Sequence, residues 1–146
     1  MAGALHTVTD NGYSFILKHF AGLLERKFLT RHDGFFDTAQ ALDFKRVICA
    51  FQPHTYSRTH ELFDDFVEVL QRPAVTLLAE IFAAREDNDI GISSADLAAK
   101  IPGSVFCPTL EDVTAKLKRL AQPGDLILTV GAGDIYLAGE ALVKEG

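Results

Sequence analysis

Apolar and polar positions follow a regular order along the chain from Arg46 onward. Short continuous apolar runs rich in β-forming residues recur four times, and such runs are typical of strands covered on both faces of a sheet. They span residues 46–51, 74–82, 104–108 and 126–133. Each is followed by a segment with apolar residues at helical spacing. The pattern therefore predicts helices over residues 60–72, 93–101, 109–121 and 134–145.

Residue types at the expected helix starts support these helices. Thr59 is a candidate N-cap for the first helix, and Ser93 or Ser94 for the second, because a hydroxyl can accept a hydrogen bond from a free backbone N–H of the first turn. Thr109 and Asp112 have the spacing of a capping box at the third. All three starts are thus predicted from local spacing.

Alternation of strand and helix predicts parallel strands joined by right-handed helical crossovers. The expected fold is α/β: a single domain with a Rossmann-like open, mostly parallel sheet and helices on both faces. Residues 46–146 form this unit. Residues 1–45 are less regular, and the apolar spacing within residues 13–28 predicts a helix there. We expect residues 1–45 to be a mainly helical segment of the same domain.

Composition narrows the classes of function. A formal net charge of −6 disfavours nucleic acid or an anionic membrane as the main partner. No apolar run approaches the ~20 residues that span a bilayer, and the N-terminus lacks the basic and apolar regions of a secretory signal. Cys49 and Cys107 lie in apolar runs, which is typical of small buried hydrophobes in a reducing compartment. We therefore expect a cytoplasmic protein with no membrane partner.

Metal ligands are not arranged at recognisable spacing. Two cysteines this far apart do not make a zinc site. Asp87 and Asp89 follow the second predicted strand, but the spacing of a calcium loop is not completed. No metal site is predicted.

Polar chemistry is concentrated just after the first strand, in the segment QPHTYSR at residues 52–58. Ligands of open parallel sheets bind beyond the carboxyl ends of the strands, and a helix start offers free backbone N–H groups. Arg58, together with His54 as a donor or a cation, is a candidate site for a carboxylate or phosphate. The alternative is that Arg58 is a solvated loop residue and His54 a packed or capping one.

Two further strand ends carry candidate chemistry. Arg85 and Glu86 follow the second strand, where they can position another charge or form a solvated turn; the residue types alone favour the turn. Residues 131–134, GAGD, lie at the end of the fourth strand, where glycines permit a tight turn and close approach of a ligand. Position 136 is tyrosine, so the dinucleotide fingerprint of an oxidoreductase is not completed. No Walker phosphate loop and no nucleophile elbow occur in the chain.

Three segments, in this order and spacing, resemble one family. They are FQPHTYSRT at residues 51–59, EIFAAREDNDIGISSADLA at residues 80–98 and GDLILTVGAGDIY at residues 124–136. The chain from about Arg46 to its end resembles the C-terminal domain of the UDP-N-acetylmuramate–L-alanine ligases, a branch of the Mur ligase family. The element Phe-Gln-Pro-His-x-Tyr-x-Arg-Thr distinguishes this branch from its relatives.

The resemblance implies an amino-acid- and nucleotide-binding domain of a larger ATP-dependent ligase of peptidoglycan synthesis. In such an enzyme, ATP and Mg²⁺ activate the muramate carboxylate of UDP-N-acetylmuramate, and the amine of L-alanine then forms the amide. The phosphate loop for ATP belongs to another domain. This chain alone is therefore expected to bind neither ATP nor Mg²⁺ and to be inactive. The alternative is a stand-alone, non-catalytic binding or regulatory module with the same fold.

The resemblance also implies roles for residues of this chain. His54, Tyr56 and Arg58 match the family's substrate-binding element, and Arg85 and Glu86 match a motif that contacts the nucleotide or a neighbouring domain. Many members carry arginine where this chain has threonine at position 55. The family's upstream motif, Asp-Tyr-Gly/Ala-His-His-Pro, does not occur in residues 1–45, so the resemblance implies no role there. No catalytic residue and no metal ligand is assigned.

Overall fold

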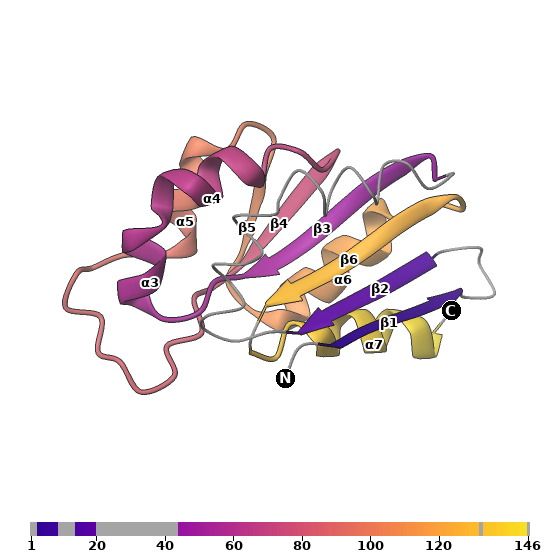
Figure 1. Ribbon diagram of the computed structural model, residues 1–146. Helices are drawn as coiled ribbons and strands as arrows, with labels where there is room; N and C mark the ends of the chain where they lie inside the picture. The colour runs from indigo at the N-terminus through magenta and orange to yellow at the C-terminus, as the bar shows by residue number, and fades with distance from the viewer. Residues whose placement is uncertain (1–2, 9–13, 20–43, 132, 146) are drawn as a thin grey trace.

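A computed structural model describes residues 3–8, 14–19, 44–131 and 133–145, and its centre is a six-stranded open sheet (Figure 1). The strands lie in the order β1-β2-β6-β3-β4-β5. Five of them run parallel, and β1 pairs antiparallel with β2 at one edge. Their bounds are β1 Gly3–Val8, β2 Ser14–His19, β3 Arg46–Gln52, β4 Val75–Ala79, β5 Val105–Cys107 and β6 Asp125–Gly131. The predicted mostly parallel α/β sheet is confirmed.

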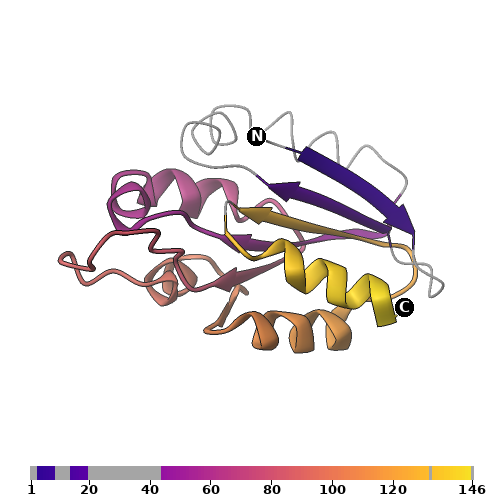
Figure 2. The same ribbon diagram turned by 90° about the horizontal axis from the view of Figure 1, so that it is seen from below.

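Helices cover both faces of the sheet, as predicted. They are α3 Tyr56–Glu61, α4 Phe63–Val69, α5 Ser94–Lys100, α6 Leu110–Leu120 and α7 Tyr136–Glu145. Residues of α4 and α5 pack in one apolar core, and residues of α6 and α7 pack in a second. Figure 2 shows α4 on one side of the sheet and α6 and α7 on the other.

Strand β3 shows why its sequence is apolar throughout. Val47, Cys49 and Phe51 belong to the core under α4 and α5, whereas Ile48 and Ala50 belong to the core under α6 and α7. All five are buried. A strand between two helical layers has no solvent-facing side, so the alternation of an amphipathic strand is lost.

The predicted helix caps are confirmed at two helices and wrong at one. Ser93 and Thr109 each cap a helix through a capping box with an aspartate three residues on. Thr59 does not cap the first helix: it is buried inside α3, and its hydroxyl donates to the carbonyl of Thr55 at 2.6 Å. Thr55 is the N-cap instead. The apolar periodicity begins only in α4, so it indicated a later start than the backbone adopts.

The helix predicted over residues 13–28 is wrong for Ser14–His19, which form β2. A short apolar run can fit either a helix or a buried strand, and periodicity alone does not separate them. Parallel pairing with β6 and antiparallel pairing with β1 decide the outcome. Residues 20–43 lie outside the described residues. β1 and β2 share one sheet with the later strands, while the division of the chain at residue 45 stays a prediction.

Both cysteines are free and buried. Burial raises the pKa of the Cys49 thiol to about 12, and burial followed by the Asp112 charge raises that of Cys107. Protonated thiols in these positions pack as small hydrophobes. Within the described ranges, no helix has the length and apolar character required to cross a membrane.

An ion pair fastens the amino-terminal ends of β3 and β6, opposite the end where ligands are expected. Arg46 Nε donates to Asp125 Oδ1 at 3.0 Å, and Arg46 Nη2 also donates to the carbonyl of Leu120. The other carboxylate oxygen of Asp125 accepts from the backbone N–H of Gln122 at 2.8 Å. The Asp125 side chain is only 2% exposed and that of Arg46 is 31% exposed, so the charges are unequally buried.

Candidate functional site

Three chain segments meet at the carboxyl edge of the sheet. The register that pairs Gln52 with Gly131 brings the end of β3 beside the end of β6, and β4 ends on the other side of β3. Segment 53–58, loop 80–93 and turn 131–135 leave these strands at the same edge (Figure 1). This is the edge at which open parallel sheets bind ligands.

The segment before α3 is held by short backbone pairing with loop 80–93. Phe82 N–H donates to the carbonyl of Pro53 at 2.9 Å, and Thr55 N–H donates to the carbonyl of Phe82 at 2.8 Å. Thr55 has φ 65° and ψ 150°, a backbone region that is almost restricted to glycine. The surrounding hydrogen bonds keep a β-branched residue in this strained conformation.

His54 and Arg58 contact each other directly. Arg58 Nη1 lies 2.9 Å from His54 Nδ1. A guanidinium carries donors and no acceptor, so Nδ1 must accept and the proton of a neutral imidazole resides on Nε2. Burial, and then the Arg58 charge, lower the pKa of His54, with Glu86 opposing this. In this geometry the His54 imidazole is neutral with its proton on Nε2, and Arg58 carries the positive charge of the pair.

Glu86 occupies the start of α3. Its Oε1 accepts from the backbone N–H of Ser57 at 2.9 Å, and its Oε2 accepts from the Ser57 hydroxyl at 2.5 Å. The hydroxyl bond, then the backbone bond, holds the pKa of Glu86 low. The backbone N–H of Arg58 donates to Thr55 Oγ1 at 3.3 Å. The expectation of free N–H groups at this helix start is therefore wrong, because a carboxylate 29 residues away in sequence fills it.

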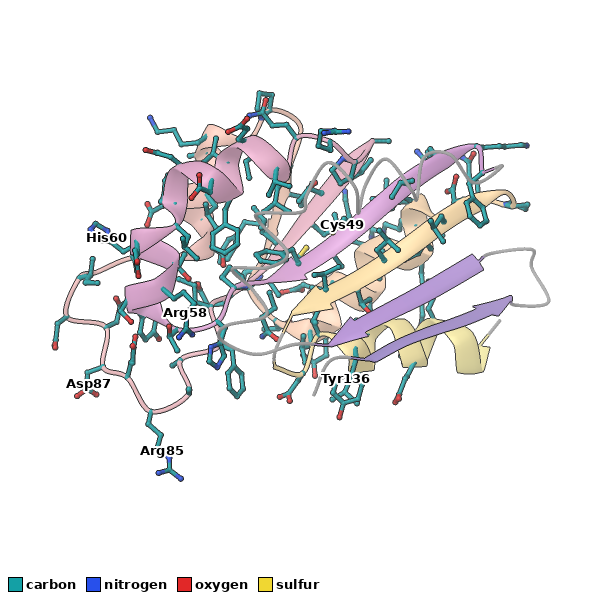
Figure 3. The ribbon with its side chains drawn as sticks, viewed as in Figure 1. Cys49, Arg58, His60, Arg85, Asp87 and Tyr136 are labelled. Atoms are coloured by element: carbon teal, nitrogen blue, oxygen red, sulfur yellow. The ribbon has the colours of Figure 1, made fainter. Side chains whose placement is uncertain are left out.

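The remaining predicted residues lie at the start of α3 and on loop 80–93. Tyr56 is the first residue of α3 and is half-buried. Arg85 is exposed, and Figure 3 shows its guanidinium pointing away from Arg58 at the tip of loop 80–93. Asp87 is exposed on the same loop. The structure thus brings together His54 and Arg58, places the Glu86 carboxylate of loop 80–93 against the first turn of α3, and directs Arg85 outward.

Sequence reasoning missed two polar side chains at this edge: Gln52, which links the ends of β3, β4 and β6, and Glu80, which links the end of β4 to the start of α5. Gln52 Nε2 donates to the carbonyl of Glu80 at 3.4 Å, and its Oε1 accepts from Ile135 N–H at 3.2 Å. The Glu80 carboxylate accepts from the Ser93 hydroxyl at 2.8 Å and from Ser94 N–H at 2.9 Å. Gln52 closes a buried apolar strand, and a buried amide requires partners. That position was the available signal.

Glycine in turn 131–135 is required by the protein itself. A Cβ on Gly133 would lie 2.6 Å from Gln52 Oε1 and 2.6 Å from Phe82 Cδ2. Such separations are far below van der Waals contact. The sequence indicated that these glycines permit a tight turn and close approach of a ligand; at Gly133 the groups that approach closely are Gln52 and Phe82.

Metal binding has no geometric support in the part of the chain that the structure describes. No group of three or more His, Cys, Asp or Glu residues lies there in an arrangement that could hold a metal ion.

Fold and site together define a Rossmann-like domain that presents an arginine–histidine pair at the carboxyl edge of its sheet. Residues 32–133 match the family model described as "Mur ligase, glutamate ligase domain". The chain therefore belongs to this family. The resemblance was expected to begin at about Arg46, and the family match begins earlier, at residue 32.

Sequence identity to individual members of the family supports this assignment. The chain is 48% identical over 103 residues to the UDP-N-acetylmuramate–L-alanine ligase of Lachnospira eligens, and 44% identical over 104 residues to that of Clostridium tetani. Each match covers 68% of this chain. The chain spans only 22% and 23% of the length of these two relatives. The resemblance to this branch of the Mur ligases is confirmed.

Solved structures show the same fold. A UDP-N-acetylmuramate–alanine ligase from Thermotoga maritima matches with a TM-score of 0.68 at 16% identity, covering 96% of this chain and 28% of that one. A domain of a UDP-N-acetylmuramate:L-alanyl-gamma-D-glutamyl-diaminopimelate-type ligase from Haemophilus ducreyi matches with a TM-score of 0.64 at 14% identity, covering 95% and 94%. At these identities, the two structures support the fold alone.

Proposed function

We propose that this chain is the C-terminal amino-acid- and nucleotide-binding domain of a cytoplasmic, ATP-dependent ligase that joins L-alanine to UDP-N-acetylmuramate in peptidoglycan synthesis. The observation that carries the proposal is the His54–Arg58 pair, set at the carboxyl edge of the sheet within the element that distinguishes this branch. The 48% identity to a relative named UDP-N-acetylmuramate–L-alanine ligase supports the proposal.

The pair suits the carboxylate of a small amino acid. Arg58 is half-buried, carries a permanent charge and presents a planar fork of donors that matches a carboxylate. His54 is neutral and has its Nε2–H as an additional donor. With Glu86 on the helix start, the side chains of Arg58 and His54, rather than the α3 backbone, bind the ligand. Tyr56 is proposed to contact the same substrate.

Holding the carboxylate at this edge directs the amine of L-alanine toward the other domains of the ligase. In the complete ligase, the muramate carboxylate would be activated by transfer of the γ-phosphoryl group of Mg²⁺-bound ATP, with ADP leaving. The unprotonated amine of L-alanine would then attack the activated carbonyl carbon, phosphate would leave, and the nitrogen would lose a proton to give the amide. The contribution of this chain is positioning and electrostatics. Arg85, which points outward, is proposed to contact the nucleotide or a neighbouring domain, and Glu86 to hold the loop that carries it.

The test places this chain in a complete ligase, in exchange for the homologous segment of the Lachnospira eligens enzyme. A charge-assisted hydrogen bond contributes about 1.5–3 kcal/mol, so Arg58→Ala is expected to raise the KM for L-alanine roughly ten- to a hundredfold. Arg58→Lys recovers part of the loss, because lysine lacks the planar fork. Arg119→Ala is the matched control, since Arg119 is an exposed arginine on α6.

Two results would contradict the proposal. An unchanged KM and kcat in Arg58→Ala would make the segment structural and the carboxylate assignment wrong. A well-folded exchange enzyme that forms no amide would favour the stand-alone binding module. The isolated chain is expected to release no phosphate from ATP, since it carries no phosphate loop.

A further inference from the structure

Phe82 is tied to His54 through its backbone. Its N–H and its carbonyl pair with Pro53 and Thr55, the two neighbours of His54 in the chain, at 2.9 and 2.8 Å. This forms an isolated parallel bridge between positions 54 and 82. The main chain of loop 80–93 therefore fixes the backbone position of His54 at the sheet edge.

The ring of Phe82 also lies against the ring of His54. The two ring centroids are 5.9 Å apart, and the ring planes differ by 15°. This is within the range of favourable aromatic contacts. The imidazole thus contacts Arg58 at Nδ1 and lies in an offset, near-parallel contact with the Phe82 ring. These two contacts restrict its rotation and so orient Nε2–H, its single N–H donor.

Gly133, in the turn after β6, packs closely against the Phe82 ring. A Cβ on Gly133 would lie 2.6 Å from Cδ2 and 2.8 Å from Cγ of Phe82. Ring carbons of a half-buried phenylalanine cannot yield by that much without moving what they contact. The Phe82 ring therefore lies between the turn after β6 and the His54 imidazole.

We propose that Phe82 is a positioning residue that orients the His54 imidazole for its ligand, and that Gly133 controls this orientation through the Phe82 ring. The orientation itself is a property of the chain, and only its effect on ligand binding rests on the proposed function. Phe82 acts through His54 and does not itself touch the substrate.

The first experiment follows His54 in this chain by NMR, with its imidazole signals assigned by comparison with His54→Gln. Phe82→Leu removes the ring from the His54 face, so the imidazole signals shift and the pKa of His54 rises toward its ordinary value. Phe82→Tyr keeps the ring and retains the parent titration. Phe106→Leu is the matched control, because Phe106 is a half-buried phenylalanine on β5. Gly133→Ala places a methyl group against both the Phe82 ring and Gln52 Oε1, and its displacement of the ring gives shifted His54 signals as well. Gln52→Ala, which removes the second contact and keeps Phe82, leaves the His54 signals at their parent positions.

The second experiment measures KM and kcat for L-alanine in the complete ligase that carries this domain. Phe82→Leu raises KM several-fold and Phe82→Tyr restores it. In the double variant with His54→Gln, Phe82→Leu adds no further loss, because both changes act on one imidazole.

The outcomes separate the two claims. Unchanged His54 signals in both Phe82→Leu and Gly133→Ala overturn the positioning role. Kinetic losses that add in full in the double variant overturn it too. Shifted His54 signals with no kinetic effect of His54→Gln leave the positioning role standing and overturn the ligand role of His54.

Discussion

Thr55 offers a quantitative test of the strained segment that precedes α3. Threonine at φ 65° and ψ 150° carries a steric cost of about 1–3 kcal/mol, because its Cβ disfavours this backbone region and glycine has none. Replacing Thr55 by glycine removes that cost, and replacing it by alanine does not. Both variants lose the same hydroxyl and methyl groups, including the 3.3 Å hydrogen bond from Arg58 N–H. The comparison of the two variants therefore isolates the backbone.

Thr109 supplies the matched control. It is also a threonine N-cap, but its φ of −124° and ψ of 163° are ordinary for any residue. At such a cap, alanine costs about 0.5–2 kcal/mol and glycine a few tenths. The glycine variant is thus expected to be more stable than the alanine variant at both positions. The difference at Thr55 is expected to be larger by about 1–3 kcal/mol, the steric cost that only glycine removes.

Urea denaturation of the four variants, with m-values compared, measures these differences. In a chain of this length, 1 kcal/mol corresponds to a change in Tm of roughly 2–4 °C. Thr55→Gly is expected to be close to or above the parent in stability, whereas Thr109→Gly lies slightly below it. Equal glycine–alanine differences at the two caps would show that Thr55 carries no backbone strain, and the reasoning would be wrong.

The Arg46–Asp125 pair and the two titrating side chains of the site give further predictions. Arg46→Met leaves a buried carboxylate without its counter-ion and is expected to lower the free energy of unfolding by about 3–5 kcal/mol. Asp125→Asn leaves an arginine that reaches water and is expected to cost about 1–2 kcal/mol. Equal losses of stability in urea denaturation would contradict the unequal burial. Because the pKa of His54 is below its ordinary 6.5 in the folded state, its contribution to stability is complete above pH 6.5 and is lost as pH falls through the folded-state pKa, so His54→Gln should flatten that part of the Tm–pH curve. The pKa of Glu86 is likewise below its ordinary 4.5, so Glu86→Gln should flatten the curve below pH 4.5, and curves parallel to the parent would refute both assignments.

Local patterns in the sequence were sufficient for the layered architecture. The apolar runs of β3, β4 and β6 required cover on both faces, and the following helical periodicities supplied it, so the parallel sheet followed from general packing rules. The Thr109 capping box and a serine cap at Ser93 or Ser94 were predictable because each depends on residues close together in the chain. The segment that carries His54 and Arg58 was found because it follows a buried strand.

Tertiary structure decided the features that depend on distant residues. Ser14–His19 became a strand because β1 and β6 flank it, and a short apolar run has no preference strong enough to resist such pairing. Glu86 fills the α3 start from a loop 29 residues away, and Phe82 reaches His54 from the same loop. Periodicity and capping act within a few residues along the chain. The neutral state of His54, the occupied helix start and the orientation of the imidazole arise from contacts across the sheet edge, which exist only once β3, β4 and β6 lie side by side.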